Sequence, residues 1–323
     1  MGNAYTATSD QATLPKYYNK VFLERLVVGP KMAQLCIKKP LPQGNGTVAY
    51  FPRVTTPSTT VSAYKLAEGT IISTEKVVDA QVSATIEQFG NAQAVTDVTN
   101  LTAISGMVEE ATRALADQAE SILDKRIISE ALGTSAVPSG AGFSTVAWNT
   151  VGATVVQMSS YATYAGTVEF RMKASTVRNA VSMLRARNVQ PMEDGFFALV
   201  AHSDTASRLR SDSEWQAAYQ YTDAESIRKG ITSAYEGVKV IVDNNIKTSA
   251  NGSNGCTLYY SLLLGHGAMG VTELDGGIKF YATNEGASKA DPINQFTSIG
   301  WKANMVPARL NLSCGLILVT ADA

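Results

Sequence analysis

Three glycines with the spacing of a dinucleotide-binding loop form the strongest chemical motif in the chain. Gly265, Gly267 and Gly270 follow an apolar stretch, residues 256–264, that is typical of a strand. In a nicotinamide-binding site such glycines open a helix whose N-terminus meets the pyrophosphate. Here residues 271–277 indicate another strand and a turn instead. We therefore expect a glycine-rich connection between strands, and keep a nicotinamide-dependent oxidoreductase that uses the Gly265 loop as an alternative.

The other catalytic residue types stand in weaker patterns. His202, Ser203 and Asp204 have the types of a hydrolytic triad, but sequence neighbours do not point at a common proton path, and Ser203 is expected to cap a helix. The second histidine, His266, has no metal-ligand spacing. The cysteines are widely spaced, as expected for buried reduced thiols: Cys36, Cys256 and Cys314. The sequence thus predicts no catalytic residue, no cofactor and no metal, and the protein is not expected to be an enzyme.

Composition favours a globular protein with much of its surface covered by other subunits. Of 323 residues, 45% are hydrophobic and only 17% are charged, and the net charge is −1. Residues 11–53 are locally basic, which suits either a phosphate-facing arm or, with better odds, a solvated segment. No apolar run reaches the length of a membrane span, and residues 1–12 are too polar for a secretory signal.

The segment of residues 76–89 alternates strictly between apolar and polar side chains. This period of two predicts a strand, and residues 47–54 are its expected partner across a Thr- and Ser-rich tip. The ribbon would reach about 45 Å. A two-stranded ribbon is marginal alone in water. Its apolar face must therefore be covered by another part of the chain or by a neighbouring copy.

A long helix is predicted over residues 105–132. Ser105 is the expected N-cap, Gly133 the expected C-cap, and Glu109 and Glu110 lie near the positive end of the helix. A helix of that length, about 42 Å, suits a spine across which other layers pack.

The remaining elements mix without a βαβ rhythm, so the fold class is α+β. Helices are expected at residues 175–187 and 212–221. Strands are expected at residues 196–201, 238–242, 256–264, 295–302 and 308–320. Residues 271–274 and 278–281 are predicted to form a hairpin around Asp275-Gly276-Gly277.

The order of these parts resembles the major capsid proteins of tailed bacteriophages, which have the HK97-type fold. The resemblance covers residues 13–305 and is carried by several long stretches rather than by a chemical motif. They are TLPKYYNKVFLERL (13–26), KKPLPQGNGTVAYFPR (38–53), LAEGT (66–70), SDSEWQAAYQY (211–221), YEGVKVIVDNN (235–245) and ADPINQFTSIGWK (290–302).

The resemblance implies a division into five parts and a role in the virion. The N-terminal arm would be residues 1–42, the extended β loop 43–100, the peripheral domain with the spine helix 101–195, the axial domain 196–295, and the return to the peripheral domain 296–323. Identical subunits would form pentamers and hexamers of an icosahedral head around double-stranded DNA, held nonspecifically through phosphate. Separate scaffolding and portal proteins, assembly in the cytoplasm of the bacterial host and no membrane partner are also expected.

Six residues are predicted to make contacts between subunits. Val78, Val82, Ile86 and Phe89 would pack the ribbon on a neighbour, and Arg53 would pair with Glu68 across subunits. A non-capsid filament or surface protein, whose Thr- and Ser-rich strands pair into fibres, remains as a further alternative.

Overall fold

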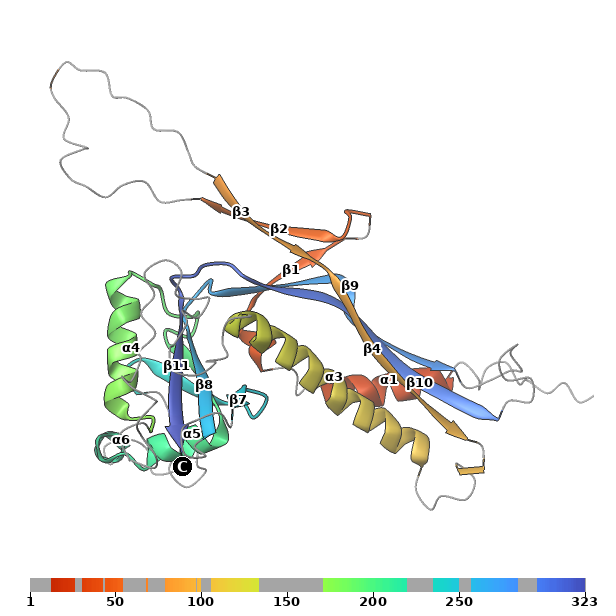
Figure 1. Cartoon of the computed structure of the whole chain (residues 1–323). Helices are drawn as coiled ribbons and strands as arrows, with labels where there is room; N and C mark the ends of the chain where they lie inside the picture. Colours follow the sequence, from red (N-terminus) through yellow and green to blue (C-terminus); the bar gives the residue numbers. More distant parts are fainter. Residues whose placement is uncertain are drawn as a thin grey trace, which may run out of the picture.

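A computed structural model describes most of the chain. The described residues are 13–26, 31–42, 44–54, 68, 79–96, 98–99, 106–133, 171–219, 235–249, 257–283 and 295–322. Within them, helices pack against two larger sheets, and a two-stranded ribbon projects from the body (Figure 1). The predicted α+β class is confirmed.

A four-stranded sheet forms one half of the body. Its strand order is β1 (Ile37–Leu41), β9 (Met269–Thr283), β10 (Phe296–Arg309) and β4 (Glu87–Thr96). β1 runs parallel to β9, and the other pairs are antiparallel. The side chains of Ile299, Trp301 and Ala303 of β10 are buried, whereas those of Ser298 and Lys302, which point to the other face, are exposed. The alternation gives the sheet one apolar face, and that face packs on a helix.

The spine helix α3 (Met107–Leu132) supplies that packing, together with α1 (Thr13–Leu26), which contacts α3 and β9. Leu115, Ala119 and Ile127 are completely buried along α3. The helix ends where the N–H of Gly133 (φ 71°) donates to the Ser129 carbonyl at 3.0 Å, as predicted. It begins at Met107 after Gly106, without a side-chain cap. The predicted cap, Ser105, lies outside the described residues.

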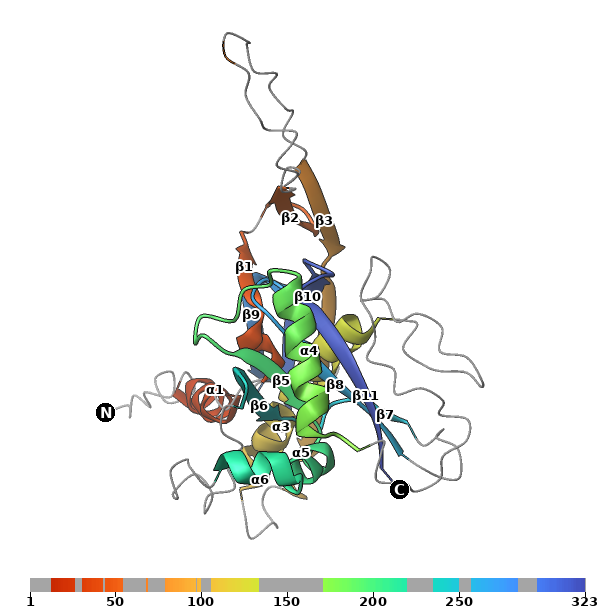
Figure 2. The same cartoon turned by 90° about the vertical axis from the view of Figure 1, so that its left-hand side faces the viewer.

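A five-stranded sheet forms the other half. Its strand order is β11 (Gly315–Asp322), β8 (Thr257–Leu264), β5 (Phe197–Ala201) and β6 (Val238–Val242), and β7 (Thr248–Ser249) pairs with β8. All five residues of β5 are buried, which explains its unbroken apolar sequence. Figures 1 and 2 show α4 (Ala174–Ala186) beside the sheet and α5 (Ser203–Arg210) and α6 (Ser213–Tyr219) at one end.

Two local predictions were wrong. The expected hairpin at residues 271–281 is one strand, β9, in which residues 274–277 bulge opposite a single residue of β10, because Gly276 and Gly277 adopt positive φ (82° and 78°). The cap of α5 is His202, whose Nδ1 accepts a hydrogen bond from the Asp204 N–H at 3.2 Å, and not Ser203.

The C-terminal strands contribute to both sheets. Residues 296–323 were expected to return to the peripheral domain, and this domain division stays a prediction. In the structure β10 joins the four-stranded sheet, and β11 pairs with β8 of the five-stranded sheet. A turn at residues 311–314, closed by the Cys314 N–H donating to the Asn311 carbonyl, separates the two strands. β9, within the predicted axial segment, lies in the first sheet.

The ribbon consists of β2 (Val48–Val54) and β3 (Asp79–Thr85). Its register, from Val48 opposite Thr85 to Val54 opposite Asp79, confirms the predicted pairing. The predicted strand is nevertheless interrupted at Ile86, beyond which β4 leaves the ribbon and pairs with β10. Both views show the ribbon pointing away from the body.

Candidate assembly surfaces

The inward face of the ribbon is covered by its own chain. Ala49 and Phe51 of β2 form a small buried cluster with Val306 and Ala308 of β10, and Val82, Ala84, Ile86 and Leu310 pack against it. Gly270 makes room for this contact, because a Cβ there would come within 3.0 Å of the Phe51 ring. The Nζ of Lys39 donates to the Tyr50 carbonyl at 2.6 Å and lies 5.7 Å from the centroid of the Phe51 ring.

The outward face of the ribbon is open to solvent. Tyr50 is 51% exposed, and Ser83, its partner across the strands, is exposed beside Gln81. Tyrosine combines an apolar ring with a polar hydroxyl and is enriched at protein interfaces, so Tyr50 makes this face a candidate contact surface. One face of the ribbon base therefore packs against β10 of the same chain, and the other face is exposed and available to a neighbouring subunit.

The six predicted contact residues fall in different surroundings. Val82 and Ile86 are half-buried in the cluster at the ribbon base, on the covered face. Phe89 lies in β4 and packs against the main core. Glu68 is exposed. Arg53 lies in β2 opposite Ala80, and its contact with Glu68 stays a prediction. Val78 lies outside the described residues.

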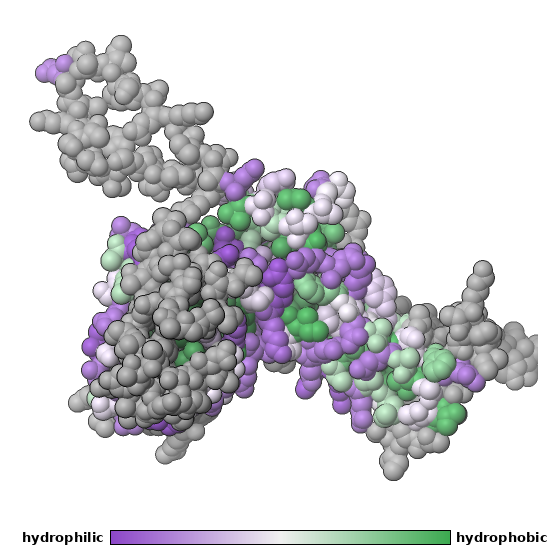
Figure 3. Space-filling model, in the orientation of Figure 1, coloured by the Kyte–Doolittle hydropathy of each residue, from purple (hydrophilic) through white to green (hydrophobic). Residues whose placement is uncertain are grey.

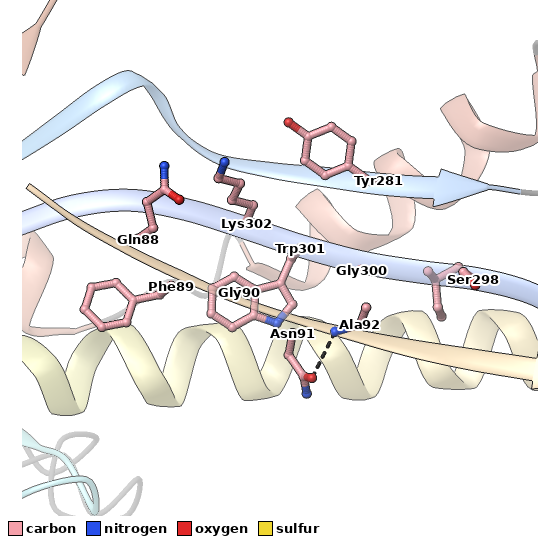
Figure 4. A pocket seen from close by; sticks show the side chains of 11 residues that line it. Gln88, Phe89, Gly90, Asn91, Ala92, Tyr281, Ser298, Gly300, Trp301 and Lys302 are labelled. Atoms are coloured by element: carbon pink, nitrogen blue, oxygen red, sulfur yellow. Dashed lines mark hydrogen bonds between the residues drawn. The ribbon is translucent and has the colours of Figure 1, made fainter. Parts of the chain in front are cut away.

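A second surface lies on the face of the four-stranded sheet that turns away from α3. A hollow of about 510 Å³ is lined by β4, β9 and β10. Figure 4 shows Gln88, Tyr281 and Lys302 rising on this side, whereas Asn91 points toward α3, where its Nδ2 donates to Gln118 Oε1 at 2.7 Å. Tyr281 is 54% exposed at the margin of the hollow.

Glycine lies at the centre of this hollow on two adjacent strands. A Cβ on Gly90 would lie 2.7 Å from the Trp301 carbonyl oxygen, and one on Gly300 would lie 3.0 Å from the Ala92 Cβ. Small residues inside strands mark places where backbone or ligand approaches closely. Glycines inside predicted strands are visible in the sequence and could have indicated this surface, but Gly90 and Gly300 were not among the predicted contact residues.

Large hydrophobic side chains are also exposed toward the far end of this sheet. They include Val98 (62%) and Phe296 (48%). Figure 3 shows apolar side chains interspersed with polar ones along this part of the body. Scattered exposure is ordinary in a monomer, but here it adjoins the hollow on one sheet.

The geometry of the glycine loop excludes a nucleotide site there. β8 ends at Leu264 and β9 begins at Met269, so no helix opens in the loop. The Gly265 N–H donates to the Cys314 carbonyl at 2.8 Å, and the His266 N–H to the Gln190 carbonyl at 2.9 Å. These amides are therefore not available to a phosphate. A Cβ on Gly265 would lie 2.4 Å from Val189 Cγ1, so the glycine is required by packing.

Asp204 and Ser203, two of the three residues with the types of a hydrolytic triad, make hydrogen bonds that hold the fold together. Asp204 accepts a hydrogen bond from the Tyr259 hydroxyl at 2.9 Å, and the Ser203 N–H donates to Asn244 Oδ1 at 3.3 Å. Among the described residues there is no cluster of three or more His, Cys, Asp or Glu that could hold a metal ion. No helix in the described part of the chain is long and apolar enough to cross a membrane.

Comparison with solved structures identifies the fold. The capsid of Ralstonia phage GP4 superposes with a TM-score of 0.65 at 14% identity, covering 91% of this chain and 89% of that one. The capsid asymmetric unit of cyanophage Pam1 gives 0.63 at 13% identity, with 89% of each chain covered. The capsid of cyanophage P-SCSP1u gives 0.57 at 16% identity, covering 90% and 87%. At such identities the likeness shows the fold.

The sequence comparisons carry the assignment further. A search of curated proteins found no match. The family described as "Phage capsid protein" matches residues 79–311, which run from β3 to the end of β10 and include the spine helix. The chain therefore belongs to the phage capsid protein family, as a major capsid protein of tailed phages with the HK97-like fold.

Proposed function

We propose that this major capsid protein builds its shell through two complementary surfaces, the outward face of the ribbon and the hollow on the four-stranded sheet. The family match carries the general assignment: identical subunits assemble into the icosahedral shell of a virion. The finer proposal rests on the exposure of Tyr50 on a ribbon that projects from the body.

The two sheets suggest roles for the parts of the subunit. The four-stranded sheet with α1 and α3 would be the peripheral domain, and the five-stranded sheet with α4, α5 and α6 would be the axial domain that meets its copies in pentamers and hexamers. Residues 43–100 would provide the extended loop. Supporting this division, each sheet has its own helices, and the described part of the ribbon packs against β10 at its base.

The contact proposed for the ribbon differs from the predicted one. Val82 and Ile86 pack against the small cluster of their own chain, so they would hold the ribbon in position. Tyr50 would then make the contact with the neighbouring subunit. The small residues of the hollow, Gly90 and Gly300, would allow a neighbouring ribbon to approach the sheet closely. Burying apolar surface contributes about 25 cal/mol per Å², and repetition around the shell multiplies a modest contact.

Substitutions of Tyr50 distinguish an effect on contact between subunits from an effect on folding of the single chain. Tyr50→Asp should leave the melting temperature of the unassembled chain within about 1 °C of the wild type, since the side chain is exposed. It should prevent shells from forming, as seen by negative-stain electron microscopy and sedimentation. Tyr50→Phe, the matched control, should still assemble. Normal shells from Tyr50→Asp would refute the proposed contact, and fibres from the wild type would favour a filament instead.

The proposed interior contents are double-stranded DNA, bound nonspecifically through phosphate. The basic N-terminal segment gives limited support, because several of its cations contact the protein itself. Arg25 pairs with Asp117 through Nε–Oδ1 at 2.7 Å, and the Lys31 Nζ donates to the Val242 carbonyl at 2.7 Å. Nonspecific binding predicts a steep loss of DNA affinity with salt and no preference for sequence. Separate scaffolding and portal proteins, and assembly in the host cytoplasm, complete the proposal.

A further inference from the structure

Two buried carboxyl groups meet where the spine helix approaches the five-stranded sheet. Asp124 of α3 is 1% exposed, and Asp243, which directly follows β6, is 2% exposed. Both carboxyl groups accept hydrogen bonds from Asn245, Asp124 through Oδ2 at 3.3 Å and Asp243 through Oδ1 at 2.9 Å, so they lie next to one another. Two carboxylates have no proton to donate to each other, so a direct hydrogen bond between them requires that one carries a proton. Neither group has a role in the assembly surfaces described above.

The hydrogen bonds around the pair join three segments that are distant in sequence. Asp124 Oδ1 accepts from the Met32 N–H at 2.9 Å, and Asp124 Oδ2 accepts from Asn245 Nδ2 at 3.3 Å. Asp243 Oδ1 accepts from the Asn245 N–H at 2.9 Å. The Ser121 hydroxyl of α3 donates to Asn245 Oδ1 at 3.0 Å. The pair therefore lies at the centre of the junction between the N-terminal segment, α3 and the end of β6.

One oxygen of the pair has no donor from the rest of the protein. Asp243 Oδ2 is buried and accepts no hydrogen bond from an amide or hydroxyl of the described residues. An ionised oxygen in that position would lose its hydration without compensation, which is costly. A proton shared with Asp124 satisfies it. Burial, together with the hydrogen bond and the charge of Asp243, raises the pKa of Asp124 to about 7.

Among the described residues, no cation forms an ion pair with Asp124 or Asp243, and the charged groups nearby act on the pair from a distance. On α3, one turn away, burial and the charges of Asp117 and Asp243 raise the pKa of the Glu120 carboxyl, while Lys31 and Arg25 act in the opposite direction. Arg25 is paired with Asp117, and Lys31 is exposed. Burial raises the pKa of the nearby Cys36 thiol to about 12, and the charge of Asp124 adds to the effect, so this thiol stays neutral.

We propose that Asp124 and Asp243 share one proton and together form a pH-dependent latch that holds α3 against the end of β6. When the proton leaves, two negative charges face each other in a dry site and repel. The contacts through Met32 and Asn245 then weaken, and the two sheets can shift relative to one another. The latch is closed below neutral pH and opens above it.

The sign of the effect on stability follows from linkage. The folded chain holds a proton on the pair up to about pH 7, whereas the unfolded chain releases it near the ordinary pKa of 3.8. The folded state binds more protons in that window, so stability falls as the pH rises from about 4 to about 7 and then levels off.

The decisive variant is Asp243→Asn, which imitates the protonated state. Its Oδ1 can still accept from Asn245, and its Nδ2 can donate to Asp124 from the position of the unsatisfied oxygen. We expect the melting temperature of the full-length wild-type chain to fall by about 5 °C from pH 5.5 to pH 8, and that of Asp243→Asn to stay nearly constant. Glu120→Gln, one turn away, is the matched control and should retain most of the wild-type slope.

Two local measurements distinguish the latch from general titration. The wild type should show the infrared band of a buried protonated carboxyl at pH 5.5 but not at pH 8.5, and Asp243→Asn should lack it at both. Hydrogen exchange of the Met32 and Asn245 amides should accelerate above pH 7, beyond the intrinsic increase, only in the wild type and the control. Equal slopes in all three proteins, or stabilisation at pH 8 by added Ca²⁺, which would mean that the oxygens hold a cation, would overturn the proposal.

Discussion

The body and the ribbon of this subunit are stabilised by very different amounts of buried surface. The body is one continuous core in which α3 contacts β10, and both sheets contribute buried side chains such as Ile299 of β10 and Leu199 of β5. The ribbon base rests on four buried residues, Ala49, Phe51, Val306 and Ala308. Strands with alternating burial occur in both, so that pattern alone does not distinguish them.

The strands of the body and of the ribbon differ in the number of elements that pack against them. The body strands belong to sheets of four and five strands that helices cover. Among the described residues, β2 and β3 pair with each other and pack against β10. We infer that the body folds as an independent unit, and that contact with a neighbour would stabilise the ribbon further.

The largest effect is expected in the body. Leu115→Ala removes a completely buried side chain from α3 and leaves a cavity, at a cost of about 3 kcal/mol. Calorimetry of the unassembled chain should show the melting temperature lowered by about 6 °C. Leu23→Ala on the exposed side of α1 is the control and should change it by less than about 1 °C. A small effect of Leu115→Ala would mean that the core is less continuous than described.

An intermediate and local effect is expected at the ribbon base. Phe51→Ala removes the largest side chain of the small cluster and should destabilise the ribbon by about 2 kcal/mol, while the melting temperature of the body stays almost unchanged. Hydrogen exchange in β2 should accelerate strongly, with little change in β5. If body and ribbon were instead one cooperative unit, both would lose protection together.

The smallest effect is expected at the root of the ribbon, where Arg126 joins α3 to β4. Its Nε lies 2.9 Å from Glu87 Oε2, and its Nη1 lies 3.0 Å from Glu130 Oε2. Arg126→Gln should cost about 1 kcal/mol at low salt and less at high salt. Urea unfolding at two salt concentrations measures this difference. Arg178→Gln, which breaks a more exposed pair with Glu214, should cost less still.

The sequence predicted well those elements whose signal is local. The spine helix, the strand at residues 256–264 and the pairing of residues 47–54 with the ribbon strand are confirmed, because long periodic patterns and caps specify them. The absence of a helix after Gly265 was also correctly expected.

Features that depend on distant contacts were missed. In the sequence, Gly276 and Gly277 have the pattern of a hairpin turn. They form a bulge because β10 pairs with the residues of β9 on both sides of them. The strand is interrupted at Ile86 because the residues before it pair with β2 and the residues after it pair with β10. The hollow needs Gly90 and Gly300 on adjacent strands, and the carboxyl pair joins residues 119 positions apart, neither of which periodicity reveals.

The order of strands in the four-stranded sheet has a consequence for synthesis on the ribosome. β4 and β1 lie on opposite edges, and the strands between them, β9 and β10, emerge nearly two hundred residues later. Until β10 has left the exit tunnel, the early strands have no central partners, so folding is expected to be largely post-translational. A chain truncated before β10 would lack the strand that joins β4 to β9 in this sheet. Incomplete translation products should therefore be unable to compete for places in a growing shell.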